Sequence, residues 1–298
     1  MLQHKQGEQR LAVVIRKFQG GAGITKEWNP AGFEVDVKTP ISALIASAPP
    51  VLRRIVVVSC GDPTSKLAEA VDADGKTFMM RAVEAAFPRE VESGLIKTAL
   101  DTNWGQNPGS ASALNVGWRA ADDGDTDLVL SWNPDFILSG HTLACGLDHM
   151  KRHNLPLCGF YRKRWFERFQ WNLFQNTATL YSMSLLREHG GFSRRCDGND
   201  GETTLIGDTK VRIMGMDDWY FYFTVLKNTG KVLPWGMYGV LKASDWKVEF
   251  PGDDLKQREF DEKIARQLVV LRTWATEIFP DIPFGHLMDQ IFEAMRQG

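Results

Sequence analysis

Residues 127–138, DLVLSWNPDFIL, restrict the fold of this chain more than any other stretch. Leu128, Val129 and Leu130 form an apolar run without polar alternation, which is typical of a strand buried in a parallel sheet. The run ends in Trp-Asn-Pro-Asp, which is a turn signal. Because ligands of open α/β sheets bind beyond the carboxyl ends of the strands, Asn133 and Asp135 are candidate site residues. Asp135 is the strongest candidate in the chain for a metal-binding carboxylate.

Strand-like and helix-like segments alternate before this stretch. Apolar runs predict strands at residues 11–15, 54–58 and 95–100, and helical spacing or start signals predict helices at residues 41–48, 76–86 and 110–121. This order predicts an α/β fold with a mostly parallel sheet, helices on both faces and a Rossmann-like, nucleotide-binding first half. The glycines at residues 20–23 lack the spacing of a phosphate-binding loop, so a flexible loop is favoured there.

Composition and charge exclude several classes of protein. The chain has 298 residues, 43% of them hydrophobic, and a net charge of −2, which allows one large domain and does not indicate a nucleic-acid partner. Its four cysteines form no Cys-x-x-Cys pair, which argues against a zinc site and fits a reducing cytoplasm. The polar N-terminus does not resemble a secretory signal, and no apolar run reaches the roughly 18 residues of a membrane span. We therefore expect a cytoplasmic protein, peripheral to the membrane if its substrate is membrane-borne.

Residues 107–117, NPGSASALNVG, place small side chains at the start of a helix. A helix of this kind can lie close to a neighbouring strand or to a ligand. Tight packing explains the alanines, but it explains Asn107 and Asn115 less well. We therefore treat Asn107, Gly109 and Asn115 as candidate ligand-binding residues.

Several motifs in this chain resemble, in the same order, those of glycosyltransferase family 2. They are Asn107-x-Gly109-x-x-x-Ala113-x-Asn115-x-Gly117, then Asn133-Pro134-Asp135 at a strand end, then Gly190-Gly191-Phe192, and finally Asp217-Asp218-Trp219 before an amphipathic helix. The resemblance covers about residues 11–233. It implies a GT-A fold, with a donor-nucleotide half at residues 11–138 and an acceptor half at residues 139–250 of a domain spanning residues 1–250.

The resemblance also implies a chemistry. It predicts a hexosyltransferase-like enzyme that uses a nucleotide-diphospho-sugar donor and Mg²⁺ or Mn²⁺ held by Asp135, with inversion at the anomeric carbon. A hard cation neutralises the charge that grows on the leaving diphosphate. A carboxylate takes the proton of the acceptor hydroxyl, and Asp218 is our choice for this general base, with Asp217 in reserve. Acidic residues also open helices for electrostatic reasons alone, so the motif order is what favours catalysis.

The chain departs from the family pattern at several positions. An acidic residue of the family that contacts the base aligns with Ser59, and Asp62 follows three residues later, so Ser59 and Asp62 are the candidates for this donor contact. Leu114 replaces a family arginine. No histidine matches the late metal ligand of many relatives; Lys242 lies in that region, so either the metal dependence is weaker or a lysine supplies part of the charge.

The acceptor side is less defined, and the acceptor itself is a glycan, a lipid-linked molecule or a small molecule. Trp165 and Trp171, in an aromatic and basic segment, and Trp219 are candidate stacking residues, although such rings also pack cores. Residues 196–210 are polar and glycine-rich and predict either a lid over the donor or a surface hairpin. His149 and His153 are four residues apart on a predicted helix, and a solvated helix face is favoured there over a metal site.

The sequence predicts a helical extension over the C-terminal part, residues 251–298. Helical periodicity covers residues 253–278, and a last helix is predicted near residues 287–295. The charges of this part are mixed, so packing on the domain or a homodimer contact is favoured over lipid binding.

Two other functions remain open from the sequence. Ser59 and Leu114 are compatible with a catalytically weak nucleotide-sugar-binding protein. Arg16 and Lys17, beside the glycines at residues 20–23, keep a nucleotidyltransferase as a further alternative.

Overall fold

A computed structural model describes residues 9–17, 30–47, 49–61, 70–102, 110–133, 138–161, 178–197, 203–206, 209–212, 215–230, 235–240, 252 and 254–297. The strands are β1 (Leu11–Lys17), β2 (Leu52–Cys60), β3 (Ile96–Asp101), β4 (Leu128–Trp132), β5 (Leu157–Tyr161), β6 (Ala178–Ser182), β7 (Thr203–Ile206), β8 (Thr209–Arg212) and β9 (Trp235–Val240). The helices are α1 (Pro30–Phe33), η1 (Glu34–Lys38), α2 (Thr39–Ser47), α3 (Phe78–Ala86), α4 (Pro88–Glu92), α5 (Ser110–Ala121), α6 (Gly140–His153), α8 (Met183–His189), η2 (Arg194–Asp197), α9 (Asp217–Thr229), α10 (Asp254–Ile278) and α11 (Phe284–Gln297).

The main sheet of the described residues has seven strands in the order β3-β2-β1-β4-β6-β5-β9. β1 pairs in parallel with both β2 and β4, and β2 pairs in parallel with β3. β6 runs antiparallel to β4 and β5, while β5 and β9 are again parallel. The prediction of a mostly parallel sheet flanked by helices is therefore confirmed, with one reversed strand that the sequence did not indicate.

Side chains from the two faces of the sheet fill two cores. Along β1, Leu11, Val13 and Ile15 point to a core shared with α2, α3 and α6, whereas Ala12 and Val14 point to a core shared with α5, α8 and α9. This alternation has the period of two that a strand imposes. Burial of both faces explains why the strands are continuously apolar.

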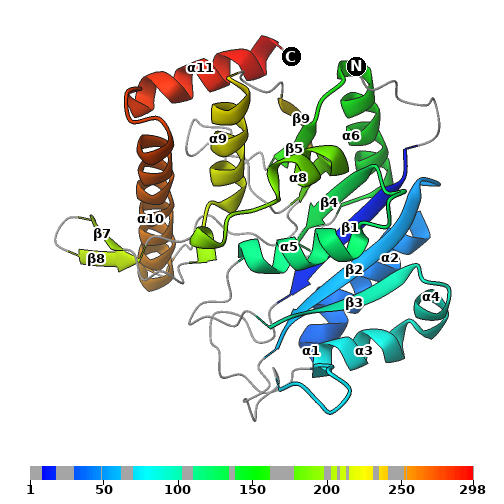
Figure 1. Cartoon of the computed structure of the whole chain (residues 1–298). Helices are drawn as coiled ribbons and strands as arrows, with labels where there is room; N and C mark the ends of the chain where they lie inside the picture. Colours follow the sequence, from blue (N-terminus) through cyan, green and yellow to red (C-terminus); the bar gives the residue numbers. More distant parts are fainter. Residues whose placement is uncertain are drawn as a thin grey trace.

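The C-terminal helices belong to the second core. Trp274 of α10 is fully buried, and Leu287 and Ile291 of α11 are also buried in the core that contains α9. Figure 1 shows α9, α10 and α11 gathered on one side of the molecule, with the β3 end of the sheet on the other side. Packing of the extension on the domain is therefore confirmed, and a dimer contact stays a prediction.

Two elements differ from the sequence prediction. The helix predicted from residue 41 already begins at Pro30, and it passes through a π-helical turn, η1, before Pro40. The Thr39 N–H bonds to Glu34 O in this wider turn, which precedes a residue that has no N–H of its own. The resemblance to glycosyltransferase family 2 also implies a strand over residues 178–186. This segment instead divides at Ser182, whose hydroxyl accepts a hydrogen bond from Leu185 N and starts α8.

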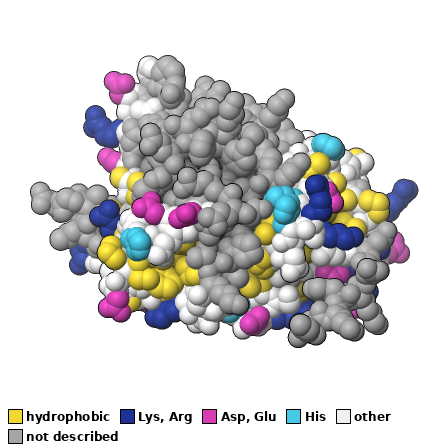
Figure 2. Space-filling view, turned by 90° about the horizontal axis from the view of Figure 1, so that it is seen from above, with side chains coloured by type: hydrophobic (Ala, Val, Ile, Leu, Met, Phe, Trp, Pro, Cys, Tyr) yellow, Lys and Arg dark blue, Asp and Glu magenta, His cyan; other side chains and the backbone are white. Residues whose placement is uncertain are grey.

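Charged side chains of both signs are mixed on the surface. On the face in Figure 2, Lys and Arg side chains lie among Asp and Glu and apolar ones, and the coloured atoms show no extended basic area. None of the helices in the described ranges is both long and apolar enough to cross a membrane.

Candidate active site

Asp217 and Asp218 form the first turn of α9, and both side chains are buried. The preceding residues, Gly215 and Met216, have positive φ angles of 84° and 57°, so the chain turns sharply into the helix. Two hydrogen bonds hold this turn: Gly215 N donates to Cys196 O at 2.7 Å, and Trp274 Nε1 donates to Gly215 O at 3.2 Å. The acidic pair is thus fixed between η2 and α10.

Burial governs the protonation of Asp218. Loss of solvent raises the pKa of Asp218 well above its ordinary value, and the neighbouring Asp217 raises it further. A hydrogen bond from Trp219 N, at 3.1 Å from Asp218 Oδ1, and the guanidinium of Arg16 act in the opposite direction.

A third carboxyl, Asp197, lies in the same region. It caps the start of α5: Asp197 Oδ1 accepts from Ala111 N at 3.0 Å, and Asp197 Oδ2 accepts from Ser112 N at 3.1 Å. Burial and the charge of Asp217 nevertheless raise the pKa of Asp197 to about 6. η2 therefore connects the start of α5 to the turn that precedes the acidic pair.

Asp101, at the carboxyl end of β3, completes the acidic group. Its Oδ1 accepts a hydrogen bond from Ser112 Oγ at 2.9 Å, and its Oδ2 lies 3.9 Å from Cys60 Sγ. The side chain of Asp101 is buried, and Asp101 raises the pKa values of both Asp197 and Cys60. Because α5 follows β3, this group lies at the carboxyl edge of the parallel strands, where α/β sheets bind ligands.

Sequence reasoning missed Asp197 and Asp101. Asp101 carries a usable signal, since it directly follows the strand predicted over residues 95–100, and Asp135 was chosen for a similar place just after a strand end. Asp197 carries none, because it lies in a polar, glycine-rich stretch that predicted a lid or hairpin. The structure places a hairpin, β7–β8, in the later part of that stretch.

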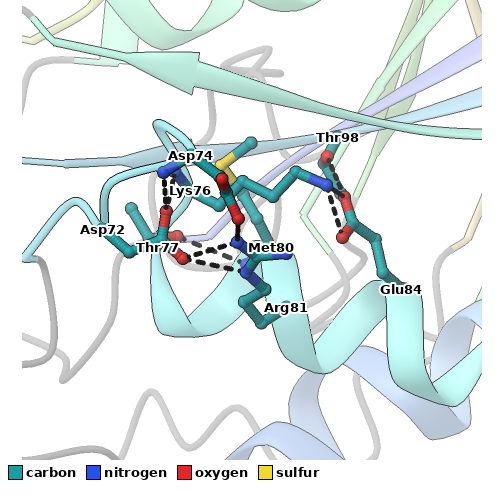
Figure 3. Close-up of polar contacts among 8 residues, drawn as sticks. All are labelled: Asp72, Asp74, Lys76, Thr77, Met80, Arg81, Glu84 and Thr98. Atoms are coloured by element: carbon teal, nitrogen blue, oxygen red, sulfur yellow. Dashed lines mark hydrogen bonds and ion pairs between the residues drawn. The ribbon is translucent and has the colours of Figure 1, made fainter.

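The predicted donor residue Ser59 is fully buried at the end of β2. Its hydroxyl hydrogen-bonds with Thr77 Oγ1 at 2.7 Å. Thr77 is in turn the N-cap of α3 and accepts from Met80 N, in the polar network of Figure 3 where Arg81 pairs with Asp72 and Asp74. The hydrogen bond between Ser59 and Thr77 therefore links the start of α3 to β2. A donor contact by Ser59 stays a prediction.

Asn115, a predicted donor residue, has a structural role. Its side chain is buried, donates to Phe192 O at 2.6 Å, and accepts from Phe192 N at 2.9 Å and from Trp118 Nε1 at 3.0 Å. These bonds use both ends of the amide, and a donor contact by Asn115 stays a prediction.

Trp219, a predicted acceptor residue, packs among aromatic side chains. Its ring is fully buried, with ring centroids 5.9 Å from Tyr222 and 5.6 Å from Phe223, and an acceptor contact by Trp219 stays a prediction. Asn133 directly follows β4 and is half-buried at the carboxyl edge of the sheet, as predicted from the sequence. The remaining predicted site residues lie outside the described residues: Asp62, Asn107, Gly109, Asp135, Trp165 and Trp171.

The predicted metal ligand, Asp135, lies outside the described residues, so the metal site stays a prediction. Within the described residues, no group of three or more His, Cys, Asp or Glu side chains is arranged to hold a metal ion. Among the described residues, Asp197 caps α5 and Asp101 accepts a hydrogen bond from Ser112, while Asp217 and Asp218 are neighbours in the first turn of α9.

The reversed strand β6, the sheet order and the acidic edge define an α/β protein of the GT-A type. No protein-family model matches the chain, and no curated protein matches its sequence. Solved structures match in three dimensions. The crystal structure of S. aureus TarS matches with a TM-score of 0.50 and 13% identity, over 97% of this chain and 43% of that chain. The crystal structure of S. aureus TarS 1-349 in complex with UDP-GlcNAc matches with a TM-score of 0.50 and 14% identity, over 97% of this chain and 72% of that one. At these identities, the similarity shows the fold.

Proposed function

We propose that this protein is an inverting, hexosyltransferase-like glycosyltransferase that moves a sugar from a nucleotide-diphospho-sugar to an acceptor hydroxyl. The observation that carries the proposal is the buried pair Asp217 and Asp218 at the start of α9, beside the carboxyl edge of a GT-A-type sheet. TarS, which shares this fold, has been crystallised in complex with UDP-GlcNAc, and this supports a nucleotide-sugar as the donor class.

Asp218 is the proposed general base. The bond between the anomeric carbon and the diphosphate oxygen breaks, and its electron pair leaves with the diphosphate. The acceptor oxygen forms the new bond to that carbon, and its proton passes to Asp218. A raised pKa suits this role, because a carboxylate with a higher proton affinity is a stronger base, and such catalysis contributes about 10²–10⁴-fold in rate.

Mg²⁺ or Mn²⁺ is part of the proposal through Asp135. The cation would neutralise the charge on the leaving diphosphate. Its test is chelation: loss of transfer in EDTA, restored by Mn²⁺, supports it, and full activity in EDTA or in Asp135→Ala removes Asp135 from the metal role.

The central experiment measures turnover with a panel of nucleotide-sugars, starting with UDP-GlcNAc. Wild type is expected to release nucleoside diphosphate, slowly with water and faster with an acceptor. Asp218→Asn should lower the rate by about 10²-fold or more. Asp289→Asn, which removes an exposed carboxyl from α11, is the matched control and should retain the wild-type rate.

Three results would redirect the proposal. Release of pyrophosphate from a nucleoside triphosphate would indicate a nucleotidyltransferase. Tight donor binding without hydrolysis or transfer would indicate a binding protein. Wild-type activity in Asp218→Asn would show that another group is the base.

A further inference from the structure

Arg16 lies at the carboxyl end of β1, next to the centre of the sheet. It pairs in register with Val58 of β2, and its neighbour Ile15 pairs with Trp132, the last residue of β4. By the alternation along the strand, Arg16 follows Ala12 and Val14 onto the face that carries α5 and α9. Its half-buried side chain therefore points to the side of the sheet where the acidic group lies.

The charge of Arg16 reaches groups on several elements. It lowers the pKa of Cys60 at the end of β2, of Tyr181 on β6 and of Asp218 on α9, in each case against a larger effect of burial. These groups come from separate parts of the chain. The register of the strands places Arg16 level with Val58, two residues before the end of β2 that carries Cys60, and so at the carboxyl edge of the parallel strands.

No partner within the described residues holds the Arg16 guanidinium by a hydrogen bond or an ion pair. Other arginines of this chain are paired: Arg54 with Asp123 and Arg187 with Asp122. A guanidinium has five N–H donors in a planar fork, and a half-buried one gains most from an acceptor that takes two of them. A phosphate group has this geometry, because two of its oxygens can each accept one N–H of the guanidinium.

We propose that Arg16 binds the diphosphate of the donor. This inference rests on the proposed function and names a contact within it. The edge of the sheet carries the carboxyls of Asp101, Asp197, Asp217 and Asp218, which would repel a diphosphate. The Arg16 guanidinium offsets that repulsion. Its attraction to the diphosphate becomes stronger as negative charge grows on this leaving group.

The test uses calorimetric titration of the full chain with UDP, inorganic pyrophosphate and uridine. Arg16→Gln should weaken the binding of UDP and of pyrophosphate by about tenfold or more, which is the affinity range of one charge-assisted contact. The binding of uridine, which has no phosphate, should be unchanged. Arg16→Lys keeps the charge without the fork and should fall between wild type and Arg16→Gln.

Arg10→Gln is the matched control. Arg10 immediately precedes the same strand at its opposite end, and its exposed side chain pairs with Asp125 at 2.7 Å. This variant loses the same charge and should bind UDP within about twofold of wild type, since an exposed pair contributes little. Thermal melting of all variants checks that the fold is retained.

The outcomes separate the two proposals. If wild type and Arg16→Gln bind UDP and pyrophosphate equally, the Arg16 inference is wrong while the proposed function stands. If Arg16→Gln changes only the pH dependence of turnover, Arg16 serves Asp218 and not the diphosphate, and the inference is again overturned. If wild type binds neither ligand, with or without Mn²⁺, both proposals fall.

Discussion

Asn115 holds Phe192 by both of its backbone groups. Its amide donates to Phe192 O at 2.6 Å and accepts from Phe192 N at 2.9 Å, across 77 residues of sequence. Trp118 Nε1 adds a third hydrogen bond to the same Asn115 oxygen at 3.0 Å. Two motifs that the sequence shows separately, the small-residue helix and the Gly-Gly-Phe turn, are therefore joined through one side chain. η2, which carries Asp197, follows that turn.

Removing this side chain should destabilise the fold strongly. Asn115→Ala leaves Phe192 N, Phe192 O and Trp118 Nε1 without their partner in a buried site. We expect a loss of about 2–4 kcal/mol in the free energy of unfolding, because buried polar groups without partners cost about 1–3 kcal/mol each and relax in part. Urea unfolding measures the change. Ser184→Ala, which removes an exposed hydroxyl contact, is the control and should change stability by less than about 0.5 kcal/mol. A similarly small effect of Asn115→Ala would mean that water replaces the bonds.

The two glycines of the turn offer a matched comparison. Both have positive φ angles, 72° at Gly190 and 82° at Gly191. A Cβ at Gly190 would meet nothing within 4 Å, whereas a Cβ at Gly191 would lie 2.4 Å from Asn115 Oδ1 and 2.5 Å from Trp118 Nε1. Gly190→Ala should therefore cost about 1 kcal/mol, from backbone strain alone. Gly191→Ala should cost about 3 kcal/mol or more, because it also displaces the Asn115 hydrogen bonds. Equal losses in urea unfolding would contradict this contact.

The sequence predicts the framework of the first half well, because buried parallel strands and amphipathic helices have strong local patterns. Residues 11–15, 54–58 and 128–130 lie within observed strands, and the strand predicted over residues 95–100 is observed one residue later, at Ile96–Asp101. The later strands are harder. β5 and β9 are short and carry glycine, and their pairing depends on β6, which runs in the opposite direction. The hydrophobic periodicity of a segment does not indicate whether its strand runs parallel or antiparallel to its neighbours.

The candidate site was only partly predictable, for a similar reason. The positions of Asp217 and Asp218 at a helix start followed from local signals and motif order. The role of Asn115 did not, since the same buried amide serves a ligand or a turn equally well until its partners are known. Asp197 acts on Ala111 and Ser112 from more than eighty residues away, and nothing near it in the sequence indicates this contact.

Close packing of α5 on the sheet should be sensitive to one methyl group. A Cβ at Gly117 would lie 2.2 Å from Val14 Cγ1 and 3.0 Å from Val58 Cγ2, so Gly117→Ala pushes α5 away from β1 and β2. We expect a loss of about 1–3 kcal/mol or more. Gly285 is also helical, in α11, and a Cβ there would meet nothing within 4 Å. Gly285→Ala should therefore stabilise the protein by about 0.5–1 kcal/mol through helix propensity and a less flexible unfolded chain. Thermal melting of the two variants should shift in opposite directions, and a common direction would refute the packing argument.

The last prediction concerns the pH dependence of stability at Asp197. A carboxylate that caps a helix ordinarily has a lowered pKa, because N–H donors favour the charged form. Here burial and the charge of Asp217 outweigh the bonds from Ala111 N and Ser112 N, and the pKa of Asp197 rises from 3.8 to about 6. The folded state then binds the proton more tightly than the unfolded state. Stability from this group is present at low pH and is lost as the pH rises through about 6.

Asp197→Asn removes the titration but keeps an oxygen that accepts from α5. Relative to wild type, this variant should gain stability as the pH rises from about 4 to about 6.5, by up to roughly 3 kcal/mol if the whole shift is expressed. Urea unfolding at several pH values measures the difference. Asp72→Asn is the control of opposite sign: the N–H of Lys76 lowers the pKa of Asp72, so this variant should lose stability relative to wild type as the pH rises through the acid range. If the difference for Asp197→Asn instead has the sign expected for Asp72→Asn, the N–H groups of α5 outweigh burial at Asp197, and the raised pKa of Asp197 is wrong.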